Sequence, residues 1–291
     1  MNVVSPRRKF IFGLAFMSLA LHGFVWQGQA QITLSHRNST ATIDPFSQAG
    51  MLHWDIQGQN QLAKQWFWYS LGPGAGGPTA SIDTISAPVI TPGVGSLTGR
   101  YVDITYGNAA FNVSVEYLLT GGAVVGANQV GTADLNESIT INNTSGAPLA
   151  FHFFQFSDFN LGLNPTNDSV QLTTDGSGHF NSASQSDGGI NSLTESVTTA
   201  NPSASHGEAS TFPLTLNKLN GGSPVVLNDN PLAGPGNVTW AFEWDMVLDP
   251  GGSFILSKDK RLNVQIVPEP AVLSLLPVGL LALRYVRRRN D

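Results

Sequence analysis

The side chains that could carry out catalysis or hold a metal are few and widely spaced in this chain. It contains six histidines and no cysteine, which excludes thiolate catalysis, disulfides and cysteine-ligated metals. The sequence has no Gly-x-Ser-x-Gly nucleophile motif, no zinc-binding histidine pair and no phosphate-binding glycine-rich loop. These features predict a protein that is not an enzyme and that needs neither a cofactor nor a metal.

His152 and Asp158 flank a strand that is rich in phenylalanine, Leu149 to Phe159. A single histidine can act as a ligand or a proton carrier, but a metal site needs further ligands close to it. No second histidine lies near in sequence. We therefore expect His152 to hydrogen-bond a backbone or side-chain acceptor rather than to bind a metal.

Two acidic features also call for an interpretation. Glu243 and Asp245 lie two residues apart on one face of a strand, and paired carboxylates can serve glycoside hydrolysis when they face each other across a cleft. On an alternating strand we expect instead a solvated outer face. The Asp-, Asn- and Gly-rich stretch 175–191 offers oxygen ligands for calcium, but it lacks the spacing of an EF-hand loop, and an ordinary loop is the simpler interpretation.

The elements that must position these side chains are β-strands. Only 12% of the residues are charged, whereas glycine (31) and proline (17) are plentiful, which favours an all-β fold with many turns. The pattern predicts strands at Ser39–Asp44, Gly50–Gln57, Leu62–Ser70, Ser81–Ser86, Arg100–Tyr106, Ala109–Leu119, Leu135–Asn143, Leu149–Phe159, Ser192–Thr199, Ser210–Leu216, Val238–Leu248, Ser253–Lys258 and Leu262–Val267. Residues 160–191 and 217–237 are predicted to be loops.

These strands predict a large antiparallel β-sandwich, with one domain over residues 31–266 and a split into two sandwiches near 120–135 as the alternative. Trp66 and Trp68 lie on one face of their strand and bulky aromatic residues on the other, so we expect a strand that is buried on both sides. A second hypothesis is that Trp54, Trp240 and Trp244 are exposed and stack against sugar rings.

Residues 1–30 have the order of a secretion signal. A basic cluster, Arg7-Arg8-Lys9, precedes a mostly apolar run, and Gly28-Gln29-Ala30 predicts cleavage between Ala30 and Gln31. The cluster resembles a twin-arginine signal, but Pro6 replaces the usual polar residue before the pair, so the export route stays open.

Residues 267–291 combine three features in a fixed order. Pro268-Glu269-Pro270 is an extended, rigid tripeptide, because proline fixes φ and disfavours a helix at the residue before it. An almost wholly apolar run follows over Ala271–Leu283. If Arg284 snorkels to the membrane surface, the run extends to Val286 and predicts a transmembrane helix over 271–286. Arg287, Arg288 and Arg289 form a basic anchor that favours the cytoplasmic side. An ordinary C-terminal membrane anchor is the alternative.

This C-terminal order resembles the PEP-CTERM sorting signal, and the resemblance covers about the last two dozen residues. It implies that an exosortase, a membrane cysteine protease, recognises Pro268-Glu269-Pro270 and removes the helix and the basic tail. It further implies a Gram-negative producer and an association with exopolysaccharide or the cell surface. Gln65–Tyr69 and Asn136–Phe159 also look like parts of other PEP-CTERM proteins, whose function is unassigned.

The region between the two ends carries 7 basic and 18 acidic residues. Such an excess of negative charge opposes binding to a phosphate backbone, so we expect no nucleic-acid partner. The main hypothesis is an exported, non-enzymatic protein of the cell envelope, outer surface or extracellular matrix. It would be anchored transiently in the inner membrane and then associate with extracellular polysaccharide. The alternative is a carbohydrate-binding or carbohydrate-active β-sandwich.

Overall fold

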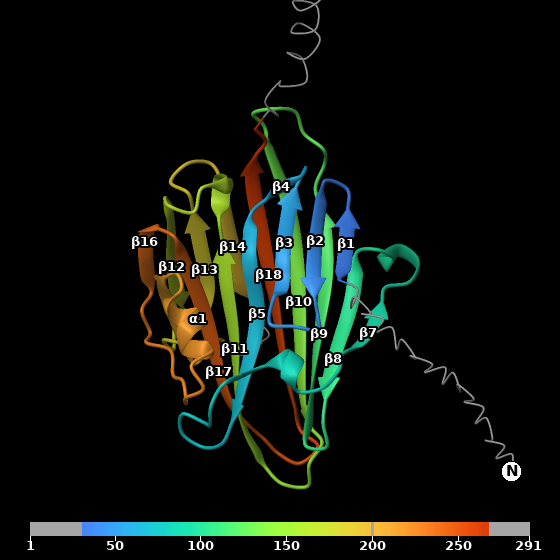
Figure 1. Ribbon diagram of the computed structural model, residues 1–291, viewed down its shortest axis with the longest axis vertical. Helices are drawn as coiled ribbons and strands as arrows, with labels where there is room; N and C mark the ends of the chain where they lie inside the picture. Colours follow the sequence, from blue (N-terminus) through green and yellow to red (C-terminus); the bar gives the residue numbers. More distant parts are fainter. Residues whose placement is uncertain (1–30, 199–200, 268–291) are drawn as a thin grey trace, which may run out of the picture.

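Two antiparallel β-sheets of nine strands each pack against one another (Figure 1). The structure is a computed structural model that describes residues 31–198 and 201–267. Within these residues there is one short α-helix, and every strand pair inside the two sheets is antiparallel. The prediction of an all-β antiparallel sandwich is confirmed.

The first sheet, sheet A, has the strand order β1-β2-β3-β5-β11-β17-β15, with β4 paired to β3 and β6 paired to β5. Its strands are β1 (Ile32–His36), β2 (Ser39–Asp44), β3 (Gly50–Ile56), β4 (Gln59–Asn60), β5 (Leu62–Leu71), β6 (Ala80–Ser81), β11 (Leu149–Phe159), β15 (His206–Thr211) and β17 (Val238–Leu248).

The second sheet, sheet B, has the order β16-β12-β13-β14-β18-β10-β9-β8-β7. Its strands are β7 (Val89–Pro92), β8 (Tyr101–Gly107), β9 (Phe111–Gly121), β10 (Val130–Asn143), β12 (Asp168–Thr174), β13 (Phe180–Ser186), β14 (Ser192–Val197), β16 (Leu232–Gly236) and β18 (Ser253–Gln265). Three 3₁₀ turns, η1 (Ile82–Thr84), η2 (Gly95–Leu97) and η3 (Leu161–Leu163), and the helix α1 (Leu214–Leu219) lie in the connections.

Both sheets are built from distant parts of the chain. β9 and β10 flank residues 122–129, where a split into two sandwiches was considered, and these two strands pair with each other along their length. β10 also pairs with β18 near the end of the described chain, and β5 pairs with β11. Each sheet therefore contains strands from both halves of the sequence.

The centre of sheet A is buried on both faces. Its inner face meets sheet B, and one contact between the two sheets is the hydrogen bond of 2.9 Å from Gln155 Nε2 on β11 to Glu195 Oε2 on β14. On the outer face, Trp66 Nε1 donates to Ser81 Oγ at 2.9 Å and Trp68 Nε1 donates to Asn220 Oδ1 at 3.0 Å. The connections at 72–87 and 212–231 thus cover the outer face, and the prediction of a doubly buried strand over Leu62–Ser70 is confirmed.

Four charged side chains lie fully buried between the sheets and form what we call the core quartet: Glu137, Glu195, Lys258 and Lys260. Lys258 Nζ lies 2.8 Å from Glu137 Oε2, and Lys260 Nζ lies 2.6 Å from Glu137 Oε1 and 3.1 Å from Glu195 Oε2. Lys258 Nζ also lies over the ring of Phe67, 5.2 Å from its centroid. Burial alone would raise the pKa of Glu137, yet the charges of the two lysines leave it below its ordinary value.

Several predicted elements are wrong in type or extent. The strand expected over Ser81–Ser86 ends at Ser81 and is followed by η1. The strand expected over Ser210–Leu216 ends at Thr211, because Pro213 has no N–H for the ladder, and α1 follows. The predicted loops at 160–191 and 217–237 contain β12, β13 and β16, whose many Ser, Thr and Gly residues concealed the strand pattern. β1 was not predicted, and Ser253 to Gln265 form one strand instead of two.

The terminal predictions lie outside the described residues. This applies to the signal segment 1–30 with Ala30, to Pro268, Glu269 and Pro270, to the apolar stretch 271–286, and to Arg287, Arg288 and Arg289. Gln31 is the first described residue, and it is exposed. Within residues 31–198 and 201–267, no helix has the length and the apolar character needed to cross a bilayer.

Candidate functional site

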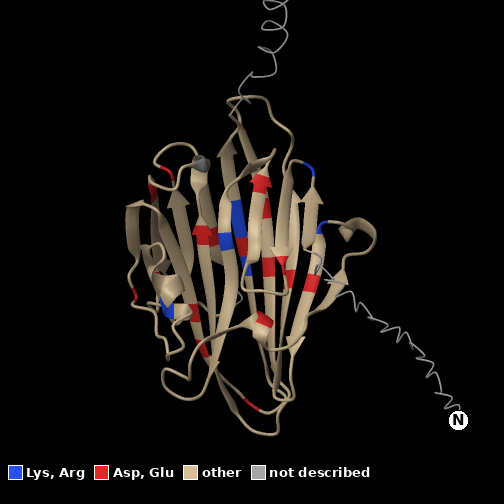
Figure 2. Ribbon diagram, in the orientation of Figure 1, with Lys and Arg blue, Asp and Glu red and all other residues tan. Residues whose placement is uncertain are grey.

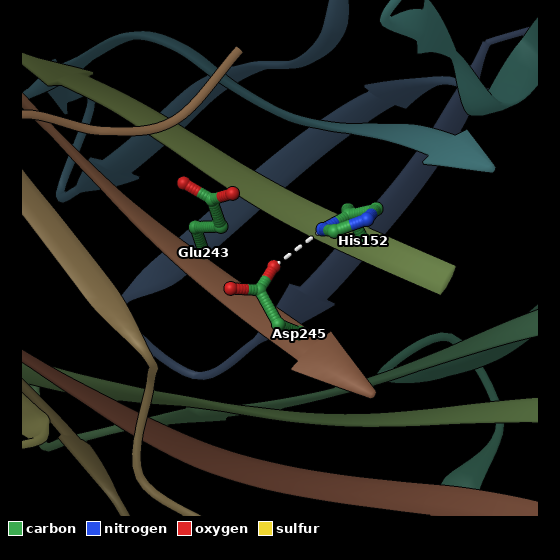
Figure 3. Close-up of side chains that lie close together, drawn as sticks. All are labelled: His152, Glu243 and Asp245. Atoms are coloured by element: carbon green, nitrogen blue, oxygen red, sulfur yellow. Dashed lines mark hydrogen bonds and ion pairs between the residues drawn. The ribbon is translucent and has the colours of Figure 1, made fainter. Parts of the chain in front are cut away.

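His152, Glu243 and Asp245 come together on the outer face of sheet A (Figure 3). β11 and β17 are neighbours in that sheet, and their register places His152 opposite Asp245 and Phe154 opposite Glu243. Residues of even number on β11 and of odd number on β17 share this face, because side chains alternate along a strand. The strand pairing therefore joins residues that are about 90 positions apart in the sequence.

Both ring nitrogens of His152 face oxygen atoms. Nδ1 lies 2.5 Å from Asp245 Oδ1, and Nε2 lies 2.9 Å from the carbonyl oxygen of Gly72. The expectation that His152 hydrogen-bonds a backbone or side-chain acceptor is confirmed. The ring also packs against Gly76, where an added Cβ would lie 2.8 Å from His152 Cδ2. The glycine-rich segment after β5 thus fixes the position of the imidazole.

Glu243 is fully buried, which corrects the prediction of a solvated outer face for this residue. The connection before β16 covers it, and the amide of Leu227 donates to Glu243 Oε2 at 2.8 Å. The pKa of Glu243 is raised to about 8, first by burial and then by the charge of Asp245, in spite of that hydrogen bond. Glu243 is therefore mostly protonated at neutral pH. The sequence pattern of β17 could not show that Glu243 is buried, because the segment that covers it belongs to the connection between α1 and β16.

Asp245 is the member of the cluster that reaches solvent, with 34% of its side chain exposed. It also lies near a second histidine, since His206 Nε2 is 3.7 Å from Asp245 Oδ2. His206 in turn contacts Asp229, with Nδ1 3.0 Å from Oδ2. No motif in the sequence singles out His206 or Asp229, which β15 and the connection before β16 bring to the site.

A polar pocket of about 570 Å³ opens beside Asp245. It lies where the chain passes from β14 in sheet B to β15 in sheet A. Most of its lining side chains can donate or accept hydrogen bonds: Asp175, His179, Asn181, Thr198, Asn201, Ser203, Ser205 and Asp245. Ser205 Oγ accepts the amide hydrogen of Asp245 at 3.0 Å, which fixes the strand at the wall of the pocket.

The three tryptophans proposed as a sugar platform are buried. Trp54 and Trp240 have no exposed surface, and Trp244 is 1% exposed. Trp240 and Trp244 face sheet B, as Trp240 Nε1 lies 3.3 Å from Gln185 Oε1 on β13. The hypothesis of an aromatic platform is wrong, because these three rings are buried in the core.

Asp158 does not join the cluster around His152, although both lie on β11. It is 5% exposed. Burial raises the pKa of Asp158 to about 6, the charge of Asp168 adds to the rise, and Lys64 opposes it. Asp168 is fully buried, and burial raises its pKa to about 6 against hydrogen bonds from Leu161 and Gln185.

The acidic groups of 175–191 are used by local turns. Asp175 Oδ1 accepts the amide and the hydroxyl of Ser177, at 2.8 and 2.7 Å, and hydrogen bonds from Ser203 and Ser177 lower the pKa of this exposed carboxylate. Asp187 Oδ1 accepts the amide of Gly189 at 2.8 Å, and Oδ2 accepts Asn191 Nδ2 at 2.6 Å. These bonds stabilise turns and give no indication of a calcium site.

No protein-family profile matches the chain, and no curated protein matches it by sequence. Its fold is similar to that of solved structures. A galactose mutarotase related enzyme from Lactobacillus acidophilus aligns with a TM-score of 0.53 and 9% identity, over 81% of this chain and 98% of that one. A protein of Escherichia coli K12, provisionally described as an aldose 1-epimerase, gives 0.51 and 9% over 81% and 99%. A bacterial glucoamylase complexed with acarbose gives 0.53 and 8%, over 86% of this chain and 36% of that one. At these identities the comparison establishes a shared β-sandwich fold.

Proposed function

We propose that this protein is an exported carbohydrate-binding β-sandwich whose sugar site is the pocket beside Asp245. The observation that carries the proposal is the lining of that pocket, where carboxylate, amide, hydroxyl and imidazole groups converge on about 570 Å³. Sugar hydroxyls both donate and accept hydrogen bonds, so such a mixed set matches them. The volume lies in the range of small-molecule sites.

The charge of the pocket narrows the class of sugar. Asp175 and Asp245 are both carboxylates, and the described chain is acidic overall, with few lysines and arginines on its strands (Figure 2). Negative walls oppose an acidic ligand, so neutral sugars fit better than uronic acids. The similar solved structures include proteins named for galactose mutarotation and for glucoamylase activity, which supports a sugar ligand on this fold.

Glycan-array binding followed by titration calorimetry tests the proposal. The variant Asp245→Asn keeps the size of the side chain and removes its charge, and we expect it to weaken binding of neutral oligosaccharides at least about tenfold, as for a charged hydrogen-bond partner. The matched control is Asp249→Asn, an exposed carboxylate on the turn after β17 that does not line the pocket. Equal binding by the wild type and Asp245→Asn would refute the site.

A second candidate function is acid–base chemistry on the bound sugar. The observation in its favour is that Asp245 and His206 are both partly exposed, 34% and 31%, and that each contacts a further charged or imidazole group, His152 for Asp245 and Asp229 for His206. One such group can remove a proton from a sugar hydroxyl while the other donates one. Polarimetry of freshly dissolved aldoses tests this function. Asp245→Asn should abolish any acceleration of anomer interconversion, and a wild type with no acceleration excludes the activity.

Export and sorting belong to the same proposal and are supported by the two terminal segments of the sequence. An exosortase would process the chain at Pro268-Glu269-Pro270, and the released protein would associate with extracellular polysaccharide at the cell surface. Glu269→Ala, or removal of residues 268–291, should shift the protein out of its normal envelope fraction and change its C-terminal mass. Unchanged fractionation and unchanged mass would refute the sorting hypothesis.

A further inference from the structure

The arrangement of His152, Glu243 and Asp245 points to a second ligand of the protein. Each residue offers one donor atom, and these three atoms lie within 4.8 Å of one another. The three side chains project from two paired strands, β11 and β17, so the sheet backbone fixes the positions of their Cα atoms (Figure 3). Ligands about 2.0–2.2 Å from a shared ion lie roughly 3–4 Å apart. Small side-chain movements are therefore enough to bring the three donors to that separation.

His152 is oriented as a metal-binding histidine is. Its Nε2 donates to the carbonyl oxygen of Gly72, and a hydrogen bond of this kind to a carbonyl orients most metal-binding imidazoles. This hydrogen bond leaves Nδ1 facing Asp245 Oδ1, which lies 2.5 Å away. A bare nitrogen lone pair and a carboxylate oxygen repel each other at that distance, so a proton or a cation must lie between them or beside both.

Glu243 supplies an independent observation. Its side chain is fully buried, and only one of its oxygens, Oε2, has a hydrogen-bond partner, the amide of Leu227. Within residues 31–198 and 201–267, no N–H or O–H group of a neighbour donates to Oε1, and only a proton on Glu243 itself can link its side chain to Asp245. A buried oxygen without a partner destabilises the folded protein, and a bound ion would remove that penalty. Among these same residues no lysine or arginine forms an ion pair with Glu243 or Asp245.

We propose that His152 Nδ1, Glu243 and Asp245 bind one divalent transition-metal ion of the Zn²⁺ class. The mixture of one imidazole and two carboxylates suits Zn²⁺ and similar ions, whereas Ca²⁺ and Mg²⁺ prefer oxygen ligands alone. Three protein ligands leave a coordination position open. Asp245 lines the sugar pocket, so that position faces the space in which a ligand hydroxyl would lie. The ion site itself does not depend on whether the pocket takes a sugar.

The test uses the full exported protein, stripped with a chelator and titrated with ZnCl₂ by calorimetry. We expect one equivalent to bind with a dissociation constant in the micromolar range or below. Asp245→Asn removes a charged ligand, and Glu243→Gln replaces a carboxyl group that can give up its proton to the ion with an amide that cannot, so each variant should weaken binding at least about tenfold. Circular dichroism establishes that each variant is folded, so that lost binding reports the site.

The matched control is His53→Ala. His53 Nε2 lies 2.8 Å from Asp55 Oδ2, which forms a second histidine–carboxylate pair near the surface but without a third ligand. Zinc binding that survives His53→Ala and is lost in Glu243→Gln supports the proposal. Binding that is equal in the wild type and both ligand variants, or lost in His53→Ala, overturns it, and so does the absence of binding at 0.1 mM Zn²⁺, about a hundred times a micromolar dissociation constant.

The visible absorption of bound Co²⁺ reports the metal ligands directly, and a change in the stability of the fold alone would not alter it. Co²⁺ in the site should give visible absorption from its nitrogen and oxygen ligands, and Glu243→Gln should remove it while His53→Ala leaves it. A spectrum that is identical in Glu243→Gln and the wild type overturns the proposal. Sugar binding measured in the presence of a chelator separates the two hypotheses, because the ion site can fail while the pocket still binds sugar.

Discussion

Two clusters of buried charged residues lie on opposite sides of sheet A, and they are neutralised in different ways. The core quartet lies between the sheets, where two lysines match two glutamates and all four side chains have no exposed surface. The cluster of His152, Glu243 and Asp245 lies on the outer face, where no lysine or arginine among the described residues pairs with the carboxyl groups and Asp245 contacts two imidazoles. β17 separates them, since Trp244 contacts Lys258 while its neighbours Glu243 and Asp245 face outward.

The difference follows from access to solvent. Neither water nor ions can readily adjust the charge of the core quartet, so the chain itself must provide equal numbers of both signs. The outer cluster reaches solvent through Asp245, and protons or ions can enter there. An excess of carboxylate is tolerable at such a place, because a bound proton or cation can balance it. Charge balance thus distinguishes a structural cluster from one that is able to bind a ligand.

The largest effect should come from breaking the balanced cluster. Glu137→Gln leaves Lys258 and Lys260 with a single carboxylate between them, and removing one partner of a buried ion pair costs about 3–5 kcal/mol. Urea denaturation should show a loss of this size in the free energy of unfolding. The control is Arg261→Ala, which removes an exposed pair with Asp134 and should cost less than about 1 kcal/mol. Equal losses would contradict the distinction between the two environments.

The second effect concerns the segment that holds His152. Gly76→Ala adds a Cβ that would lie 2.4 Å from Ser70 Oγ and 2.8 Å from His152 Cδ2, at a backbone φ of +70°. We expect a loss of about 1–3 kcal/mol in stability and weaker binding of Zn²⁺. Gly74→Ala is the matched control, because Gly74 has a similar φ of +66° and open space around its Cβ position. The difference between the two variants measures the combined contacts with Ser70 and His152, and identical behaviour would show that these contacts have no effect.

The third effect concerns Asp158, a buried carboxyl group whose Oδ1 has no hydrogen-bond partner among the described residues. The pKa of Asp158 is about 6 in the folded protein, above its ordinary value near 4, so the folded state binds this proton more tightly than the unfolded chain does. The stability contributed by this group is therefore lost as the pH rises from about 4 through 6. Asp158→Asn should be more stable than the wild type at pH 8, by on the order of 1–2 kcal/mol.

That advantage of Asp158→Asn should shrink as the pH falls below 6. Urea denaturation at pH 8, 6 and 4.5 measures it. Asp249→Asn, at an exposed position, should show no such dependence on pH. An Asp158→Asn curve parallel to that of the wild type would show that Asp158 is as solvated as an exposed carboxylate.

The smallest effect should come from the substitution that matches Glu137→Gln in the other cluster. Glu243 is mostly protonated at pH 7, so Glu243→Gln preserves its charge as well as its shape. We expect the free energy of unfolding in metal-free buffer to change by less than about 1 kcal/mol, as for an isosteric exchange. A loss as large as that of Glu137→Gln would show that an ionised Glu243 is needed for folding.

The sequence predicted those elements in which local pattern and tertiary environment agree. Leu149–Phe159 and Val238–Leu248 were predicted with their observed bounds, because long alternating runs of large residues have few other structures available. β12 and β13 were missed because their inward residues are few and their outward residues are serine and threonine, which are also typical of loops. The same ambiguity concealed β16, where glycine and proline predominate.

The candidate site was predicted only in part. Alternation placed Glu243 and Asp245 on one face, and the lack of a second histidine nearby in the sequence predicted that His152 is a hydrogen-bonding residue. The sequence could not show that Asp245 would be the partner of His152, which lies 93 positions earlier, because strand pairing decides that contact. Nor could it show that residues near Leu227 would bury Glu243.

By itself, the amino-acid sequence determined an acidic, cysteine-free, all-β antiparallel sandwich, because composition and side-chain alternation act locally along the chain. Only the tertiary structure decided which charges were buried, which were neutralised by lysines and which were left for a proton or an ion. The physical reason is that the free energy of a charge depends on its distance from water and from other charges. Those distances are set by segments far apart in the chain.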